Sequence, residues 1–149
     1  MQITKAIPAD CASMTQLITA SKRHWGYPDE WMALWQDELT ITPEKLDERD
    51  FYLGKKDAEL IFIYSLSQLD ATRYELEDCW VAPEHIGHGY GRILFDDVKK
   101  RLGSLGAKRL KIISDPNAAD FYRKMGAVQV GEAPTRIKGR TFPVFELRL

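Results

Sequence analysis

Residues 83–94 read P-E-H-I-G-H-G-Y-G-R-I-L, with alternating glycines at Gly87, Gly89 and Gly91. An apolar stretch typical of a strand precedes them at residues 76–81, and apolar residues at helical spacing follow them. Glycine allows backbone angles closed to other residues, so successive N–H groups can converge on one point. The start of the following helix adds unpaired N–H donors. The sequence therefore predicts a phosphate-binding loop between a strand and a helix.

The spacing of this loop narrows the choice of ligand. The pattern G-x-G-x-G differs from the dinucleotide fingerprint G-x-G-x-x-G and from the mononucleotide loop G-x-x-x-x-G-K-[ST]. No acidic residue ends a following strand, where it could hold a ribose. Arg92, in the first turn of the predicted helix, is a cation suited to phosphate oxygens. The loop by itself leaves open that the glycines merely turn the chain.

A second motif lies at residues 115–127, which read D-P-N-A-A-D-F-Y-R-K-M-G-A. Together the two segments resemble the GNAT superfamily of N-acetyltransferases, whose acetyl-CoA loop is usually P-x-x-[RQ]-G-x-G-[IY]-G and whose next helix carries N-A-x-x-F-Y-x-K-x-G-F. The three loop glycines match, as do Asn117, Ala118, Phe121, Tyr122, Lys124 and Gly126. Ile86 departs from the pattern, because the family usually has Arg or Gln there. His85 and His88 flank this gap and could supply part of the missing hydrogen bonding.

The order of predicted elements is that of an α/β protein. Strands are expected at residues 2–7, 51–55, 59–66, 73–81, 108–114, 128–130 and 142–149, and helices at residues 10–21, 30–39, 43–49, 91–102 and 117–125. The resemblance implies the GNAT acyl-CoA N-acyltransferase fold, with a mixed central sheet that contains splayed parallel strands and is flanked by helices. We expect a single GNAT N-acetyltransferase domain over residues 1–149.

Composition excludes several classes of protein. The 149 residues suit one domain, and the 44% hydrophobic content supports a core. A net charge of -1 gives no overall field favouring nucleic acid. Cys11 and Cys79 lack the spacing of metal ligands, so we expect neither a disulfide nor a metal site. No apolar run could span a bilayer or act as a signal core, so we expect a cytoplasmic protein without a membrane partner.

The resemblance implies acetyl-CoA as co-substrate and suggests where it binds. In the family the pantetheine arm lies between two splayed parallel strands, here residues 76–81 and 108–114. Asn117 would reach the arm, although an N-cap of its own helix is an equally weighted role. Lys124 would meet the 3′-phosphate or simply be solvated. The predicted cofactor-binding residues are Cys79, Trp80, Val81, Gly87, His88, Gly89, Tyr90, Gly91, Arg92, Asn117, Phe121 and Lys124.

The resemblance also implies catalytic residues. Tyr122 is the implied proton donor to the departing thiolate, with a phenol pKa of about 10 close to that of a thiol. The alternative is a core aromatic residue. Glu77 is our first choice as general base and Asp78 the second, because adjacent side chains of a strand face opposite ways. Solvent-facing or ion-paired roles with Arg73 or Lys111 stay open for these carboxylates.

Aromatic residues in a connecting segment indicate the acceptor side. Residues 24–28 read H-W-G-Y-P, and we expect Trp25 and Tyr27, with Phe142 opposite, to line an amine pocket. We expect Trp31 and Trp35 to be residues of the hydrophobic core.

The sequence thus predicts an N-acetyltransferase that moves an acetyl group from acetyl-CoA to a primary amine of a small molecule or peptide, by direct attack in a ternary complex. A non-catalytic CoA-binding regulatory module on the same fold is the alternative. A nucleotide-binding protein that only resembles the family is a third hypothesis. The oligomeric state is left open, a homodimer included.

Overall fold

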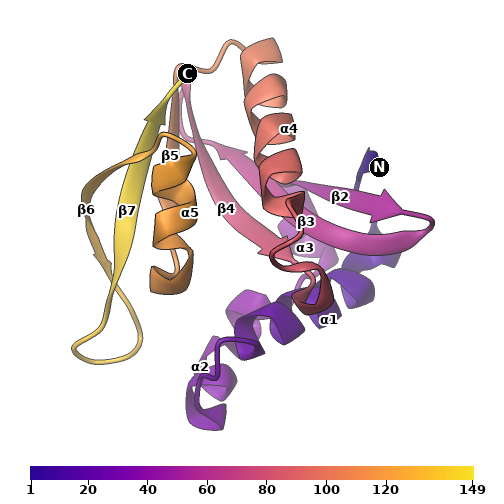
Figure 1. Ribbon diagram of the computed structural model, residues 1–149, viewed down its shortest axis with the longest axis vertical. Coiled ribbons are helices and arrows are strands. Elements are labelled where there is room, and N and C mark those ends of the chain that lie inside the picture. Colours follow the sequence, from indigo (N-terminus) through magenta and orange to yellow (C-terminus); the bar gives the residue numbers. More distant parts are fainter. The chain divides into compact units, whose positions relative to one another are not determined.

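The computed structural model describes all residues from 1 to 149. They form two compact units: residues 1–66 with 78–94, and residues 67–77 with 95–149. Figure 1 shows the elements, which in chain order are β1 (Gln2–Lys5), η1 (Pro8–Asp10), α1 (Cys11–Arg23), α2 (Asp29–Leu39), α3 (Pro43–Glu48), β2 (Asp50–Lys56), β3 (Glu59–Gln68), β4 (Arg73–Val81), η2 (Pro83–His85), α4 (Tyr90–Ser104), β5 (Arg109–Ile113), η3 (Pro116–Ala118), α5 (Ala119–Lys124), β6 (Val128–Pro134) and β7 (Thr141–Arg148).

The strands form one mixed sheet of seven strands in the order β1-β2-β3-β4-β5-β7-β6. β4 and β5 pair in parallel, and the β1–β2, β2–β3, β5–β7 and β6–β7 pairs are antiparallel. A mixed sheet flanked by helices confirms the predicted fold class.

In the first unit, an antiparallel meander of β1, β2 and β3 supports the N-terminal helices. The β2–β3 hairpin turns at Asp57 and Ala58, which adopt φ values of 51° and 66°, as a two-residue hairpin turn requires. The paired faces bury several aromatic rings, and Tyr52 stacks on Tyr64 at 5.1 Å between ring centroids. The same unit contains the end of β4 and the glycine loop.

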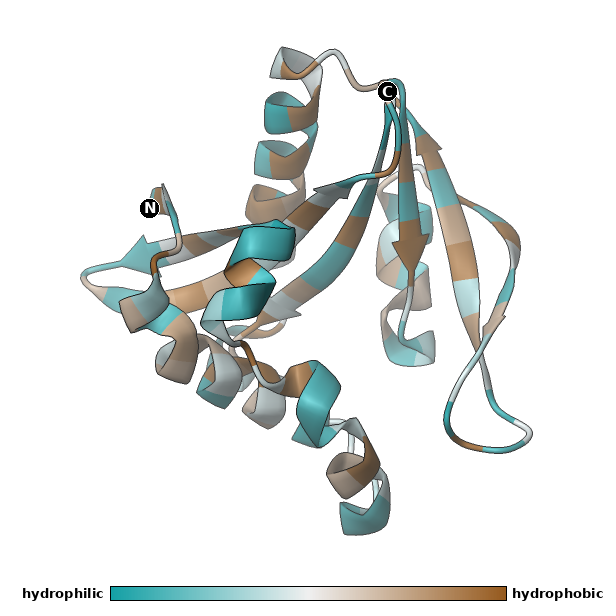
Figure 2. Cartoon of the chain, turned by 180° about the vertical axis from the view of Figure 1, so that it is seen from behind, coloured by the Kyte–Doolittle hydropathy of each residue, from teal (hydrophilic) through white to brown (hydrophobic).

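In the second unit, β4 and β5 run in parallel. Their paired stretch extends from Arg73 opposite Arg109 to Leu76 opposite Ile112, while β4 itself continues to Val81. β6 and β7 form the antiparallel hairpin seen at the C-terminal end of the chain in Figure 1. The α4 and α5 side chains that belong to this unit bury their apolar faces, and Figure 2 shows the hydrophobic and hydrophilic residues alternating along these helices.

Most predicted elements form at the expected residues, and the main differences are at the C-terminal end. The helix predicted from Asn117 begins only at Ala119, after the short 3-10 turn η3. The strand predicted at 128–130 continues to Pro134, because its backbone pairs with β7 as far as Thr141. No helix is both long and apolar enough to cross a membrane.

Candidate active site

The glycine loop joins β4 to α4 within the first unit. Ala82 N donates to Ile61 O at 2.8 Å, and this bond anchors the point where the chain leaves the sheet. Gly87 and Gly89 both adopt a φ of 84°, a region that side chains disfavour. A Cβ atom added at either position would meet no other atom within 4 Å. The positive φ of these two glycines, and not a lack of room for a side chain, therefore favours glycine at both positions.

Hydrogen-bond donors remain at the start of α4. The first turn of a helix has N–H groups without intrahelical partners, and the helix dipole adds partial positive charge there. Arg92 lies in that turn and is exposed. His88 is also exposed, whereas His85 is directed at Glu59, with Nε2 2.8 Å from Oε1. His88 is thus the flanking imidazole that remains exposed beside the loop.

The carboxylates of β4 face opposite sides, as the strand period predicts. Glu77 is exposed, and Asp78 is buried. Asp78 accepts hydrogen bonds from Ser65 Oγ and from Arg49 Nε, the latter at 3.1 Å, while its backbone N–H donates to Ser65 Oγ at 3.0 Å. These contacts make Asp78 part of the scaffold. Glu75 forms an ion pair with Lys111 on the parallel neighbouring strand, with 3.8 Å between Oε1 and Nζ. Pairing with Lys111 is one of the alternatives that the sequence left open for the acids of this strand.

The second motif lies in the second unit. Asp115, not Asn117, caps the start of η3: its carboxylate accepts from Asn117 N at 2.9 Å and from Asn117 Nδ2 at 3.0 Å. The N-cap role considered for Asn117 is therefore wrong, because the turn begins two residues earlier. The Asn117 side chain is exposed, and Lys124 is exposed as well.

Tyr122 lies in an aromatic cluster of the second unit. Its side chain is only 5% exposed, and its ring centroid lies 6.2 Å from Phe95, 5.3 Å from Phe121 and 6.0 Å from Phe145. These contacts fix the ring. Phe142, on β7 in the same unit, is half-buried, with the Arg140 guanidinium 5.8 Å from its ring centroid.

The aromatic residues near residues 24–28 form a cluster in the first unit. Tyr27 contacts Trp31 at 5.9 Å and Trp35 at 5.0 Å between ring centroids. The ammonium of Lys22, a buried residue, lies 4.2 Å from the Trp35 ring centroid and 6.0 Å from that of Trp80. Nothing in the sequence indicated that Lys22 is buried among aromatic rings, because a lysine near the end of a helix is normally exposed to solvent.

Two further observations distinguish the aromatic residues of this region. Trp25 is 42% exposed and its ring contacts His24, so it lies on the surface. Trp35 is buried, as expected of a core residue. The indole N–H of Trp80, at the end of β4, is buried without a hydrogen-bond partner. A buried unpaired donor costs about 1–3 kcal/mol, which favours an interaction with a bound molecule or water.

The predicted site residues are divided between the two units. The first unit contains Trp25, Tyr27, Cys79, Trp80, Val81, Gly87, His88, Gly89, Tyr90, Gly91 and Arg92; the second contains Glu77, Asn117, Phe121, Tyr122, Lys124 and Phe142. The structure thus brings the whole glycine loop and the end of β4 together in one unit, and the residues of the second motif together in the other.

The family model for GNAT acetyltransferases matches residues 12–127. The chain belongs to the GNAT acetyltransferase family. The match covers the glycine loop and the second motif, and it includes residues of both units. Acetyl transfer is accordingly the reaction class of this GNAT protein. No curated protein matches the sequence.

Several solved structures share the fold of this chain. A GCN5-related N-acetyltransferase from Rhodopseudomonas palustris has a TM-score of 0.85 at 22% identity, covering 99% of this chain and 95% of that one. The PaiA N-acetyltransferase from Thermoplasma acidophilum, solved with coenzyme A, has a TM-score of 0.82 at 19% identity, with coverage of 99% and 98%. A GNAT acetyltransferase from Elizabethkingia anophelis, solved with acetyl-CoA, has a TM-score of 0.69 at 20% identity, with coverage of 99% and 97%. At these identities the likeness shows the fold.

Proposed function

We propose that this GNAT protein transfers the acetyl group of acetyl-CoA to a primary amine of a small molecule or peptide. The observation that carries the proposal is the glycine loop. Gly87 and Gly89 both hold left-handed backbone angles directly before the start of α4, and both Cα positions face open space. Converging N–H groups at a helix start suit a diphosphate. Coenzyme A or acetyl-CoA in related GNAT structures supports this ligand.

Each part of the donor would have its own partners. The backbone of residues 87–91 and the cation of Arg92 would hold the diphosphate. The backbone of Cys79, Trp80 and Val81 would bind the thioester carbonyl and the pantetheine arm, because β4 continues beyond its paired stretch with β5. Asn117 and Phe121 would contact the arm, and Lys124 would meet the 3′-phosphate. His88 and Tyr90 complete the loop.

The chemistry needs several proton and bond changes. The protonated amine loses one proton, and the free nitrogen forms a bond to the thioester carbon. The carbon–sulfur bond then breaks to release a thiolate, and the nitrogen gives up a second proton to solvent to leave a neutral amide. We assign the first proton transfer to Glu77, directly or through a water, because Asp78 is held by Arg49 and Ser65. Tyr122 then protonates the thiolate. Much of the rate would come from holding both substrates in line.

We assign the acceptor side to the aromatic segment of the first unit. Trp25 and Tyr27 would contact the amine substrate, and Phe142 would form a further wall. The partly exposed ring of Trp25 is available for such contact. The Lys22 ammonium beside Trp35 places a positive charge in this region, which favours acceptors that do not bring a second cation next to it.

A panel of amines tests the proposed function. The protein is incubated with acetyl-CoA and each amine in turn, and free thiol is measured against a control without amine. Release of thiol with at least one amine, together with a product heavier by one acetyl group in mass spectrometry, supports the proposal. Tight CoA binding without turnover of any amine would instead support the non-catalytic CoA-binding module.

A further inference from the structure

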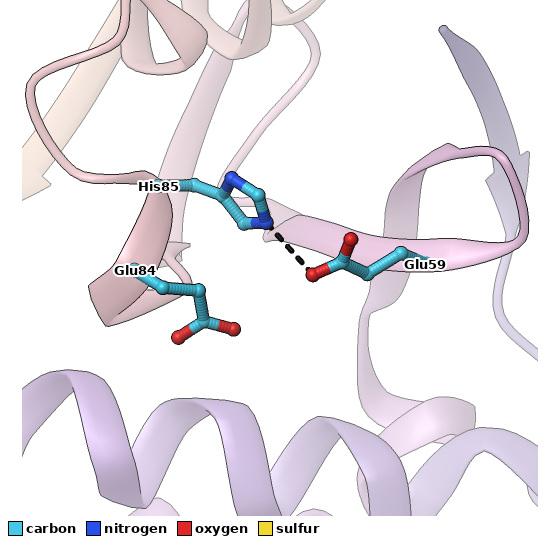
Figure 3. A group of neighbouring side chains, drawn as sticks. All are labelled: Glu59, Glu84 and His85. Atoms are coloured by element: carbon cyan, nitrogen blue, oxygen red, sulfur yellow. Dashed lines mark hydrogen bonds and ion pairs between the residues drawn. The ribbon is translucent and has the colours of Figure 1, made fainter.

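Three side chains with metal-binding groups meet outside the candidate active site. Glu59 begins β3, and Glu84 and His85 belong to η2, in the same unit. One ligand atom from each of the three lies within 4.8 Å of the other two. Figure 3 shows the His85 ring and the Glu59 carboxylate facing each other, with the Glu84 side chain beside them.

The imidazole is the oriented member of this group. His85 Nε2 lies 2.8 Å from Glu59 Oε1, and the Tyr90 ring meets the imidazole edge-on at 5.5 Å between centroids. The His85 side chain is 22% exposed, whereas that of Glu59 is 56% exposed. An oriented imidazole with two exposed carboxylates beside it can surround an ion, because exposed side chains can adjust their positions. The two carboxylates also carry negative charge that attracts a divalent cation.

The ligand chemistry selects the ion. Imidazole suits Zn²⁺ and neighbouring transition ions, whereas Mg²⁺ and Ca²⁺ prefer oxygen ligands alone. Zn²⁺ binds nitrogen and oxygen at about 2.0–2.2 Å, which places the ligand atoms of a tetrahedral site about 3.3 Å apart. Glu59 Oε1 and His85 Nε2, now 2.8 Å apart, would separate slightly and exchange their hydrogen bond for bonds to the ion. The exposed Glu84 side chain would move inward to join them.

The geometry points to a Zn²⁺ site formed by Glu59, Glu84 and His85, with water in the fourth position. The ion would link the start of β3 to η2, and η2 ends two residues before Gly87. The expectation of no metal site rested on cysteine spacing. The Glu59 and His85 ligands are 26 positions apart in sequence, and only the pairing of strands brings them together.

Cobalt serves as a spectroscopic probe of the site. The untagged chain is freed of metal with a chelator and titrated with Co²⁺, and Zn²⁺ binding is measured by calorimetry. We expect the visible absorption of a low-coordinate Co²⁺ centre, displaced by Zn²⁺, with a single ion per chain. Glu59→Gln and His85→Gln should each weaken binding at least about tenfold, since even the loss of an outer-shell partner costs about 10–100-fold.

Matched variants separate this site from other ligands. His88→Gln removes an exposed imidazole three positions away and should leave Zn²⁺ affinity unchanged. Cys11→Ser should also have no effect, because burial raises the pKa of the Cys11 thiol and disfavours the thiolate that binds metal. The absence of Co²⁺ absorption and of Zn²⁺ binding heat in the wild type would overturn the proposal. So would unchanged affinity in folded Glu59→Gln and His85→Gln, with folding checked by circular dichroism.

Discussion

Arg49 donates from Nε to the carboxylate of Asp78 at 3.1 Å, and both side chains are largely buried. Ser65 adds a hydroxyl hydrogen bond to the same carboxylate. Both bonds are made to Oδ2 of the buried Asp78, whereas Glu77, the preceding residue of β4, is exposed. Replacing Asp78 by Asn and Glu77 by Gln should therefore have different effects: the first on stability, the second on the reaction rate.

Asp78→Asn should mainly lower stability. The amide keeps the shape of the side chain but loses the charge that Arg49 contacts, and we expect a loss of about 1–3 kcal/mol in the free energy of unfolding, measured by urea denaturation. Glu77→Gln should leave stability within about 0.5 kcal/mol, as for most exposed positions.

Glu77→Gln should instead change the pH–rate profile. Between the ordinary pKa of a carboxyl group and that of an amine, the amine is protonated while a carboxylate can still act as a base. The kcat/KM of the variant should therefore fall furthest in this intermediate range of pH. The measurement is kcat/KM against pH for wild type and variant, with an acceptor found in the amine panel. Superimposable profiles would remove Glu77 from the mechanism.

Acetyl-CoA should raise the melting temperature, as any ligand of the native state does. Gly89→Val should abolish most of that shift, because the β-branched side chain fills the open space before α4 and resists a φ of 84°. The positive φ also strains the variant by roughly 1–2 kcal/mol and lowers its melting temperature without ligand. The shift caused by acetyl-CoA is therefore measured from the melting temperature of the ligand-free variant. If high micromolar acetyl-CoA left the melting temperature of the wild type unchanged, the proposed diphosphate site at the glycine loop would be disproved.

Tyr122→Phe should retain acetyl-CoA binding and fold normally, since the ring keeps its contacts with Phe95 and Phe145. Loss of the phenol proton should lower kcat by about 100-fold or more. A calorimetric titration with CoA and steady-state rates separate the two effects. An unaltered rate in the chemical step, measured in a single turnover, would make Tyr122 a core aromatic residue.

Trp25→Ala should raise the acceptor KM and leave the acetyl-CoA KM unchanged. The ring is 42% exposed, so little core packing is lost. Trp35→Ala is the matched contrast: this buried ring should cost about 3–5 kcal/mol in stability. If Trp25→Ala left every acceptor KM unchanged, the aromatic segment at residues 24–28 would lose its assigned role.

Gly54→Ala should destabilise the protein, because the added Cβ would collide with the buried Phe62 ring on the paired strand. Overpacking of this kind typically costs about 1–3 kcal/mol. Gly103→Ala is the control: it lies in α4 with open space around it and should gain up to about 1 kcal/mol. Thermal or urea unfolding of both variants checks the opposite signs.

The sequence alone predicted the order of the elements, the fold class and a glycine loop between β4 and α4. These depend on local properties: the alternation of apolar residues along strands, their helical spacing, and glycines where the backbone must adopt a positive φ. β4 begins at Arg73 and ends at Val81, as predicted. The two GNAT motifs are contiguous in sequence, so they too could be recognised without coordinates.

Only the tertiary structure decided which side chains meet. The partners of Asp78 come from residue 49 and from β3, the Lys22 ammonium reaches the Trp35 ring, and Glu59 faces His85. Each of these contacts joins residues of different helices, strands or turns. The periodicity of the sequence predicts the individual elements but not which of their side chains will be neighbours. They form because strand pairing and helix packing bring distant residues together, and this long-range pairing determines which acid is part of the scaffold and which stays exposed.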